Sequence, residues 1–276
     1  MKLSGYVNRF LLLLILSFTT LILHCQDQTK SNLYVPYVGQ PGKDVIWVPT
    51  PFELVDKMLE LAGVTDTDYV VDLGSGDGRT VIAAAKLGAR ALGIEYNADM
   101  AEISKKKAEE AGVSMNTKFI QADLFEYNLS EATVITMFLL PDINLKLRPR
   151  LLDLKPGTRI VSNTFTMGNW EPDYEATTEG NWDSWYTALL WIIPAKIEGV
   201  WNLGPGVLNI YQEFQMIYGT LKTEDKTSII TEGRLNGDKI TFSVDGAKYS
   251  GRVTGKSTMA GTADSGSGKR EWIATR

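Results

Sequence analysis

An apolar strand that runs directly into a glycine-rich turn constrains this chain more than any other feature of its sequence. The strand is expected at Tyr69–Leu73, the turn at Gly74–Gly78 and a helix at Thr80–Leu87. Glycines let a backbone turn sharply and approach a ligand closely, and the N-terminus of the following helix favours a negative group nearby. The pattern therefore indicates a ligand site at the carboxyl end of the strand.

Signals for strands and helices continue to alternate on both sides of this turn. Thr50-Pro51-Phe52-Glu53 fits a helix start, with Thr50 as the capping residue. Alternating strands and helices indicate βαβ units around a parallel sheet. We therefore predict a doubly wound α/β domain with a mainly parallel sheet over residues 44–194. Its further strands are expected at Ala91–Ile94, Lys118–Gln121, Ala132–Leu139 and Arg159–Asn163, and its further helices at Asp99–Ala111 and Asn144–Leu152.

The polar residues around the turn discriminate between classes of nucleotide cofactor. The next strand ends at Glu95, where an acid can accept hydrogen bonds from two ribose hydroxyls. A dinucleotide fingerprint has the spacing GxGxxG, whereas this chain has GxGxG, with Arg79 in place of the third glycine. The acids Asp72 and Asp77 would contribute little to the binding of a pyrophosphate, but both would favour the binding of a cofactor with a cationic amino-acid end. This favours S-adenosylmethionine. A nicotinamide or flavin cofactor and an incidental glycine-rich turn are the alternatives.

The segment Asp72–Arg79 resembles motif I of the class I S-adenosylmethionine-dependent methyltransferases. Glu95 matches the ribose-binding acid of that family, and Gln121–Phe125 matches the segment in which an Asp meets the adenine amino group. The resemblance implies a Rossmann-like methyltransferase domain and S-adenosyl-L-methionine as the cofactor. The residues that it assigns to cofactor binding are Asp72, Gly74, Ser75, Gly76, Asp77, Gly78, Glu95, Tyr96, Asp123 and Leu124.

A narrower resemblance covers about residues 44–195. Four segments are similar to a subgroup of mitochondrial protein-lysine methyltransferases and their bacterial relatives: Val48–Pro51, Ala122–Phe125, Ala132–Pro141 and Leu151–Ser162. The mitochondrial members act on the adenine nucleotide translocase and on the c-subunit of ATP synthase. This resemblance implies a methyltransferase with a protein or small-molecule acceptor, and N-methylation of protein lysine in particular. The alternative is a cell-envelope binding or structural protein that keeps the methyltransferase-like fold without catalysis.

Methyl transfer from a sulfonium needs few protein groups, because the enzyme mainly positions the acceptor. Asp142 lies in Leu139-Leu140-Pro141-Asp142, where a substrate-facing residue is expected, and it is the catalytic candidate. An aspartate also suits a helix cap at this place. Trp47 precedes the first helix, where class I folds often form an acceptor lid. Its ring suits an acceptor's methylene chain or cation, or simple packing on the sheet edge.

The composition excludes several classes of partner and mechanism. The formal net charge of −5 argues against general nucleic-acid binding, so we predict no nucleic-acid partner. DNA-base amino methylation commonly uses an Asn/Asp-Pro-Pro-aromatic motif, and Leu139–Asp142 takes that place here. His24 and Cys25 are the chain's only histidine and cysteine, which leaves no spacing typical of a metal site. We therefore predict no metal.

The N-terminal residues have the pattern of an export signal. Lys2 and Arg9 precede an apolar run of about 14 residues, which is too short to span a bilayer comfortably and is typical of a signal peptide. Ile22-Leu23-His24-Cys25 loosely resembles a bacterial lipobox, which implies lipidation of Cys25. Cleavage elsewhere and an uncleaved anchor are alternatives. We predict a signal peptide or lipoprotein signal over 1–25, a linker or arm over 26–43, and membrane association. The cell envelope is the predicted location, with the cytosolic face of the inner membrane as the alternative.

The pattern changes near Pro194. Beyond it the chain shows short strands separated by Gly, Asn and Asp, and Asn236-Gly237 is a hairpin signal followed by alternating Ile240, Phe242 and Val244. Turns every 8–12 residues or so are typical of a small antiparallel barrel or sandwich. We predict a separate all-β meander module over 195–276. In the alternative function, this module would hold an apolar ligand.

Overall fold

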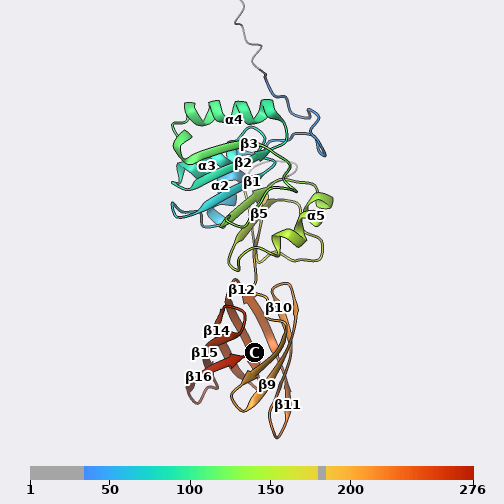
Figure 1. The fold of residues 1–276 in the computed structure, drawn as a ribbon, viewed down its shortest axis with the longest axis vertical. Coiled ribbons are helices and arrows are strands. Elements are labelled where there is room, and N and C mark those ends of the chain that lie inside the picture. The colour runs from blue at the N-terminus through green and yellow to red at the C-terminus, as the bar shows by residue number, and fades with distance from the viewer. Residues whose placement is uncertain (1–33, 180–184) are drawn as a thin grey trace, which may run out of the picture. The chain divides into compact units, whose positions relative to one another are not determined.

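The predicted parallel strands form one mixed sheet of seven strands in the order β3-β2-β1-β4-β5-β7-β6 (Figure 1). The structure, a computed structural model, describes residues 34–179 and 185–276. Neighbouring strands from β3 to β5 are parallel, whereas β7 is antiparallel to both β5 and β6. The strands are β1 (Tyr69–Leu73), β2 (Arg90–Glu95), β3 (Thr117–Gln121), β4 (Val134–Met137), β5 (Arg159–Asn163), β6 (Tyr174–Thr177) and β7 (Thr187–Ile192).

Helices cover both faces of this sheet, which is why its central strands read as apolar runs. Val70 of β1 packs in a core cluster with α2, α3 and α4, while the next residue, Val71, packs in a second cluster with α5. Successive side chains of a strand point to opposite faces, so the two clusters lie on opposite sides of the sheet. The helices are α2 (Phe52–Leu61), α3 (Arg79–Lys86), α4 (Ala98–Glu110) and α5 (Pro141–Leu151), with a short 3-10 turn η1 (Ser114–Asn116).

Helices α3 and α4 begin one residue before their predicted starts, whereas α2 differs in its capping residue and α5 begins a full three residues early. Helix α2 has Pro51 at its N-cap without a side-chain cap, so the capping role predicted for Thr50 is wrong. The Thr50 hydroxyl instead accepts a hydrogen bond from Asn163 Nδ2 at 3.3 Å. Helix α5 begins at Pro141, three residues before the predicted start at Asn144, because proline suits the first position of a helix.

The C-terminal residues form an antiparallel barrel. Together with the mixed sheet, it confirms the predicted fold class, an α/β domain with an all-β meander module. Pairing of β10 with β9 closes a sheet of order β11-β10-β12-β13-β14-β15-β16-β8-β9. Trp201, Phe242, Tyr249 and Trp272 are buried in its interior. The strands are β8 (Gly199–Leu203), β9 (Gly206–Glu213), β10 (Met216–Lys222), β11 (Thr227–Ile229), β12 (Thr231–Asn236), β13 (Lys239–Val244), β14 (Ala247–Thr254), β15 (Thr258–Asp264) and β16 (Lys269–Thr275).

The turn between β9 and β10 packs on the segment that joins β5 to β6. Residues 37–276 form one compact unit, and within it the Phe214 and Trp170 rings stack with centroids 5.6 Å apart. Trp170 Nε1 donates to Gln215 Oε1 at 2.8 Å, and Gln215 Nε2 donates to the carbonyl of Glu171 at 2.9 Å. Both Trp170 and Gln215 are buried, so these hydrogen bonds satisfy polar groups that water cannot reach.

The signal peptide, the lipidation of Cys25 and the membrane association predicted for the N-terminus stay predictions. The signal segment 1–25, with Cys25, lies outside the described residues, and the domain boundaries predicted at 25, 43 and 194 stay predictions. Among residues 34–179 and 185–276, no helix has the length and apolarity that crossing a bilayer requires.

Replacing Gln215 by alanine should destabilise the protein. The change leaves the buried Trp170 indole N–H without a partner, which costs about 1–3 kcal/mol. Urea denaturation of wild type and Gln215→Ala measures this difference. Glu213→Ala, at an exposed neighbour in the same hairpin, is the matched control and should change the free energy of unfolding by less than about 0.5 kcal/mol. Equal effects of the two changes would show that the buried contact contributes nothing specific.

Candidate functional site

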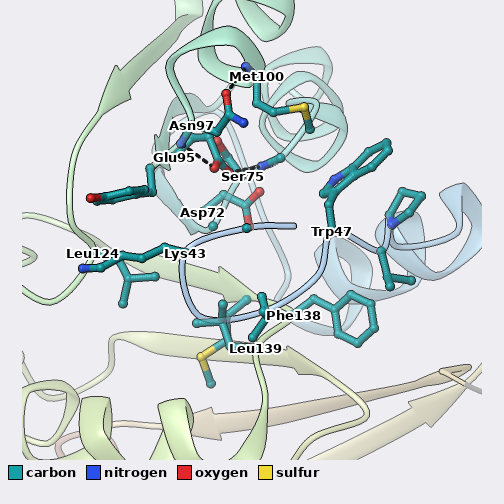
Figure 2. A pocket seen from close by; sticks show the side chains of 18 of the residues that line it. Lys43, Trp47, Asp72, Ser75, Glu95, Asn97, Met100, Leu124, Phe138 and Leu139 are labelled. Atoms are coloured by element: carbon teal, nitrogen blue, oxygen red, sulfur yellow. Dashed lines mark hydrogen bonds between the residues drawn. The ribbon is translucent and has the colours of Figure 1, made fainter. Parts of the chain in front are cut away.

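A cavity of ≈ 280 Å³ lies at the carboxyl ends of β1, β2 and β4 (Figure 2). The strand order reverses direction between β1 and β4, and open α/β sheets bind ligands at such a switch point. Gly78, at the start of α3, is the one predicted cofactor residue that does not line the cavity. Those that do are Asp72, Gly74, Ser75, Gly76, Asp77, Glu95, Tyr96, Asp123 and Leu124.

The glycine-rich turn approaches its neighbours so closely that side chains would not fit. Gly76 has a φ of 53°, and a Cβ built there would lie 2.5 Å from Trp47 Nε1. Gly78 has a φ of 79°, and its Cβ would lie 2.7 Å from the Cβ of Ser104. Both values lie in the left-handed region that glycine tolerates best. Between these glycines and the end of β1, Ser75 lines the cavity, and its buried hydroxyl has no hydrogen-bond partner among the described residues.

The half-buried carboxylate of Glu95 joins the end of β2 to this turn. Its Oε2 accepts a hydrogen bond from the Gly76 amide at 2.8 Å, and its Oε1 accepts one from the Asn97 amide at 2.9 Å. Asn97 in turn caps α4 by accepting from the amides of Asp99 and Met100. These contacts fix the carboxylate at the cavity wall while leaving each oxygen further lone pairs for the hydroxyls of a ligand.

Asp72, at the carboxyl side of β1, is a buried acid without a cationic partner in the described part of the chain. Burial raises the pKa of its carboxyl to about 7, and the charges of Glu95 and Asp77 add to that effect. The hydroxyl of Thr136 donates to it at 2.6 Å, which opposes the rise. An acid in this state is stabilised in its charged form by a positive group, so the cavity favours a ligand with a cation at this end.

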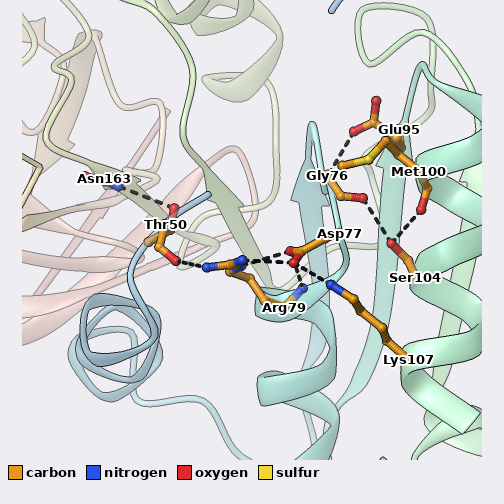
Figure 3. A network of polar contacts seen from close by, with 9 residues as sticks. All are labelled: Thr50, Gly76, Asp77, Arg79, Glu95, Met100, Ser104, Lys107 and Asn163. Carbon is orange, nitrogen blue, oxygen red and sulfur yellow. Dashed lines mark hydrogen bonds and ion pairs between the residues drawn. The ribbon is translucent and has the colours of Figure 1, made fainter. Parts of the chain in front are cut away.

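Asp77 has a different role from Asp72, although the sequence pairs them. Its carboxylate accepts from Arg79 Nε at 2.9 Å and from Lys107 Nζ at 2.7 Å (Figure 3). Burial alone would raise the pKa of Asp77, but these two cations outweigh it and hold the pKa below its usual value. Arg79 also donates to the carbonyl of Thr50 at 2.8 Å. Asp77 therefore ties α3, α4 and the segment before α2 together. Asp72 is then the acid of the pair without a cationic partner among the described residues, and the cation-binding role predicted for the pair stays a prediction.

Lys43 occupies the far end of the cavity, and no signal within the predicted arm pointed to it. Its Nζ lies 2.5 Å from Asp123 Oδ2 and 4.8 Å from the centre of the Tyr96 ring. The hydrogen bond from Lys43 is the main reason that the pKa of Asp123 is lowered. Asp123 Oδ1 also accepts from the Phe125 amide at 2.8 Å. A ligand amino group that binds Asp123 therefore competes with Lys43 for the same carboxylate.

The remaining wall of the cavity, beyond β4 and β5, is apolar. Figure 2 shows Phe138 and Leu139 on the side away from Glu95 and Asn97. Asp142 does not line the cavity: it is exposed in the first turn of α5, whose N-cap is Leu140. The catalytic role predicted for Asp142 therefore stays a prediction. The residues that line this wall are Phe138, Leu139, Leu140, Ile143, Phe165 and Trp185.

The chain matches two family models of methyl-transferring domains. Residues 72–174 match the ANTKMT methyltransferase domain, and residues 28–106 match a DNA methylase model. The first match spans the glycine-rich turn, Glu95, Asp123 and all of the wall beyond β4 except Trp185.

The curated relatives and a solved structure that the chain matches are also methyltransferases. The protein-lysine N-methyltransferase of Saccharolobus islandicus is 41% identical over 164 residues, which are 58% of this chain and 96% of that protein. The adenine nucleotide translocase lysine N-methyltransferase of Mus musculus is 33% identical over 51% of this chain and 58% of its own length. A structure described as an RNA methyltransferase from Salinibacter ruber, in complex with S-adenosyl-L-homocysteine, is 51% identical with a TM-score of 0.51. That match covers 54% of this chain and 96% of the solved one.

Because the pKa of Asp72 is raised, we expect this residue to make the free energy of unfolding depend on pH. An unfolded aspartate titrates near pH ~3.9, whereas burial raises the pKa of Asp72 to about 7 in the folded protein. The folded state therefore binds more protons between about pH 4 and pH 7, and this carboxyl lowers the stability as the pH rises through that window. Asp72→Asn removes the titration. Its free energy of unfolding, minus that of wild type, should be higher at pH 8 than at pH 5 by roughly 2–3 kcal/mol. Urea denaturation at both pH values measures this, and a difference that does not change with pH would contradict the assignment.

Proposed function

This chain belongs to the class I S-adenosylmethionine-dependent methyltransferases, within the protein-lysine N-methyltransferase subgroup, and on that premise we propose that it methylates the side-chain amino group of lysine in a protein. The relatives that carry this name support the choice of acceptor. The observation that carries the proposal is the division of one cavity into a polar half, with Asp72, Glu95 and Asp123, and an apolar half beyond β4.

The cofactor is S-adenosylmethionine, and the polar half of the cavity fits it. Asp72 suits the cationic amino-acid end, Glu95 suits the ribose hydroxyls, and Asp123 suits the adenine amino group. The unpaired Ser75 hydroxyl and the close approach at Gly76 are the features of a cradle built for a ligand. When bound, the cofactor would supply its sulfonium methyl group to an amine nitrogen that has already lost a proton, and S-adenosylhomocysteine would be the leaving group.

The apolar half of the cavity fits an amine acceptor that must lose its proton. No side chain that lines this half is a general base among the described residues. Removing an ammonium group from water lowers its pKa, because burial disfavours the charged form. We infer that desolvation, together with positioning, makes the acceptor reactive.

The N-terminus supports a further part of the proposal. Lys2, Arg9 and the apolar residues after them support association with a membrane of the cell envelope through a signal peptide or through a lipidated Cys25. The cytosolic face of the inner membrane is the alternative location. The alternative function, a binding protein with a ligand inside the barrel, has no support in the described residues, where aromatic side chains pack the barrel interior.

Radiolabelling tests the proposed acceptor. Purified protein is incubated with S-adenosylmethionine carrying a tritiated methyl group and with a cell extract. We expect protease-sensitive, nuclease-resistant label and methyllysine after acid hydrolysis. Gly76→Val is the control, because its side chain would collide with Trp47 and enter the cavity, and it should transfer no label. The name of the Salinibacter structure makes RNA the competing acceptor. Label that a ribonuclease removes, or no transfer at all by wild type, would overturn the proposal.

A further inference from the structure

Three aromatic side chains from separate segments converge on the apolar half of the cavity. Phe138 follows β4, Phe165 follows β5 and Trp185 precedes β7, and all three line the cavity. The Phe138 and Phe165 rings stack with centroids 5.8 Å apart and an interplanar angle of 17°. The Trp185 ring meets Phe138 edge-on at 5.7 Å. We call these three residues the aromatic wall, with Phe138 at its centre.

The backbone holds Phe165 in place by an unusual turn. Thr164 has a φ of 57°, which is an outlier for a β-branched residue. The Phe165 carbonyl accepts hydrogen bonds from Ser162 Oγ at 2.8 Å and from Asn144 Nδ2 at 3.3 Å. Strained backbone persists where the surroundings over-determine it, and it clusters at ligand sites. The backbone that carries the Phe165 ring is therefore fixed before any ligand arrives.

The aromatic wall lies opposite the charged residues of the cavity. Asp72, Glu95 and Asp123 lie within the last two residues of β1, at the end of β2 and just after β3. The wall and its apolar neighbours Leu139, Leu140 and Ile143 instead follow β4 and β5 or precede β7. A group that enters this half meets aromatic and aliphatic side chains. Ring faces carry partial negative charge and attract cations.

We propose that the aromatic wall is the acceptor subsite, which holds the methylene chain of lysine against its rings and receives the nitrogen as a cation, before its proton is lost. This inference rests on the proposed function and names the residues that select its acceptor. The attraction between a cation and an aromatic ring is stronger when both are out of water. The wall would therefore hold lysine, and the methylated lysines that keep its charge, more tightly than a neutral aliphatic side chain of similar length.

The same rings could in principle stack a nucleobase, and the chemistry of the wall decides against this. A base that leaves its stack is recognised by hydrogen bonds to its polar edge as well as by stacking. The side chains of the wall and its neighbours are hydrocarbon apart from the Trp185 indole N–H. Burying a base edge there would leave several polar atoms unpaired, which is costly. A lysine side chain has one polar group, at its end.

The test uses the full-length protein loaded with S-adenosylhomocysteine. Calorimetry first measures the affinity for S-adenosylhomocysteine of wild type, Phe138→Leu, Phe165→Leu and the control Tyr174→Leu, which changes an exposed aromatic residue outside the cavity. NMR titration of each loaded protein then follows Nα-acetyl-trimethyllysine N-methylamide, its neutral counterpart Nα-acetyl-norleucine N-methylamide, and uridine and adenosine.

We expect S-adenosylhomocysteine to bind all four proteins within about twofold, since the wall lies away from Asp72 and Glu95. The trimethyllysine probe should bind wild type and Tyr174→Leu equally and bind Phe138→Leu and Phe165→Leu about 3- to 30-fold more weakly. The norleucine probe should respond little to either change. Equal binding of the trimethyllysine probe to all four loaded proteins would overturn the inference alone. Binding of a nucleoside that depends on Phe138 would replace it with a base subsite. Failure of wild type to bind S-adenosylhomocysteine would overturn the proposed function and, with it, the inference.

Discussion

The geometry of the site depends on the ion pairs that the Asp77 carboxylate forms with Arg79 and Lys107. Arg79 and Lys107 neutralise the carboxylate, and through them it joins the glycine-rich turn to α3 and α4. Arg79 extends the connection to Thr50, whose hydroxyl is held from β5 by Asn163 (Figure 3). A buried acid needs such partners, because an unpaired charge away from water is unfavourable. The fixed turn then leaves Asp72, without a cationic partner among the described residues, as the acid available to a ligand.

The central sheet and the polar half of the cavity could be predicted from the sequence, because their signals are local. Strands β1 and β4 are buried on both faces and read as apolar runs, and Glu95 lies at the end of the next strand after the turn. The contact of Lys43 with Asp123 spans 80 residues, and the aromatic wall joins three separate segments. No periodicity encodes such long-range contacts. Helix α5 starts earlier than its apolar pattern indicates, which places Asp142 in an exposed first turn.

This chain extends beyond the Saccharolobus methyltransferase that it resembles. The Saccharolobus relative is matched over 96% of its length by 58% of this chain, so the remainder of this chain has no counterpart there. The β9–β10 turn buries Gln215 against Trp170, in the segment that also carries Phe165. The barrel is therefore in contact with the segment that supplies one ring of the aromatic wall. Sequence patterns predicted its hairpins but not this contact, which pairs two buried side chains 45 residues apart.

The polar half of the cavity, at the ends of β1, β2 and β3, is assigned to the adenosyl cofactor. Calorimetric titration of S-adenosylhomocysteine into wild type and Glu95→Ala tests this assignment most directly, since Glu95 is assigned to the ribose. We expect wild type to bind one equivalent of S-adenosylhomocysteine with saturation. Loss of two charge-assisted hydrogen bonds should weaken the affinity of Glu95→Ala about 30- to 1000-fold. Equal affinities of the two proteins, or no binding by wild type, would contradict the account.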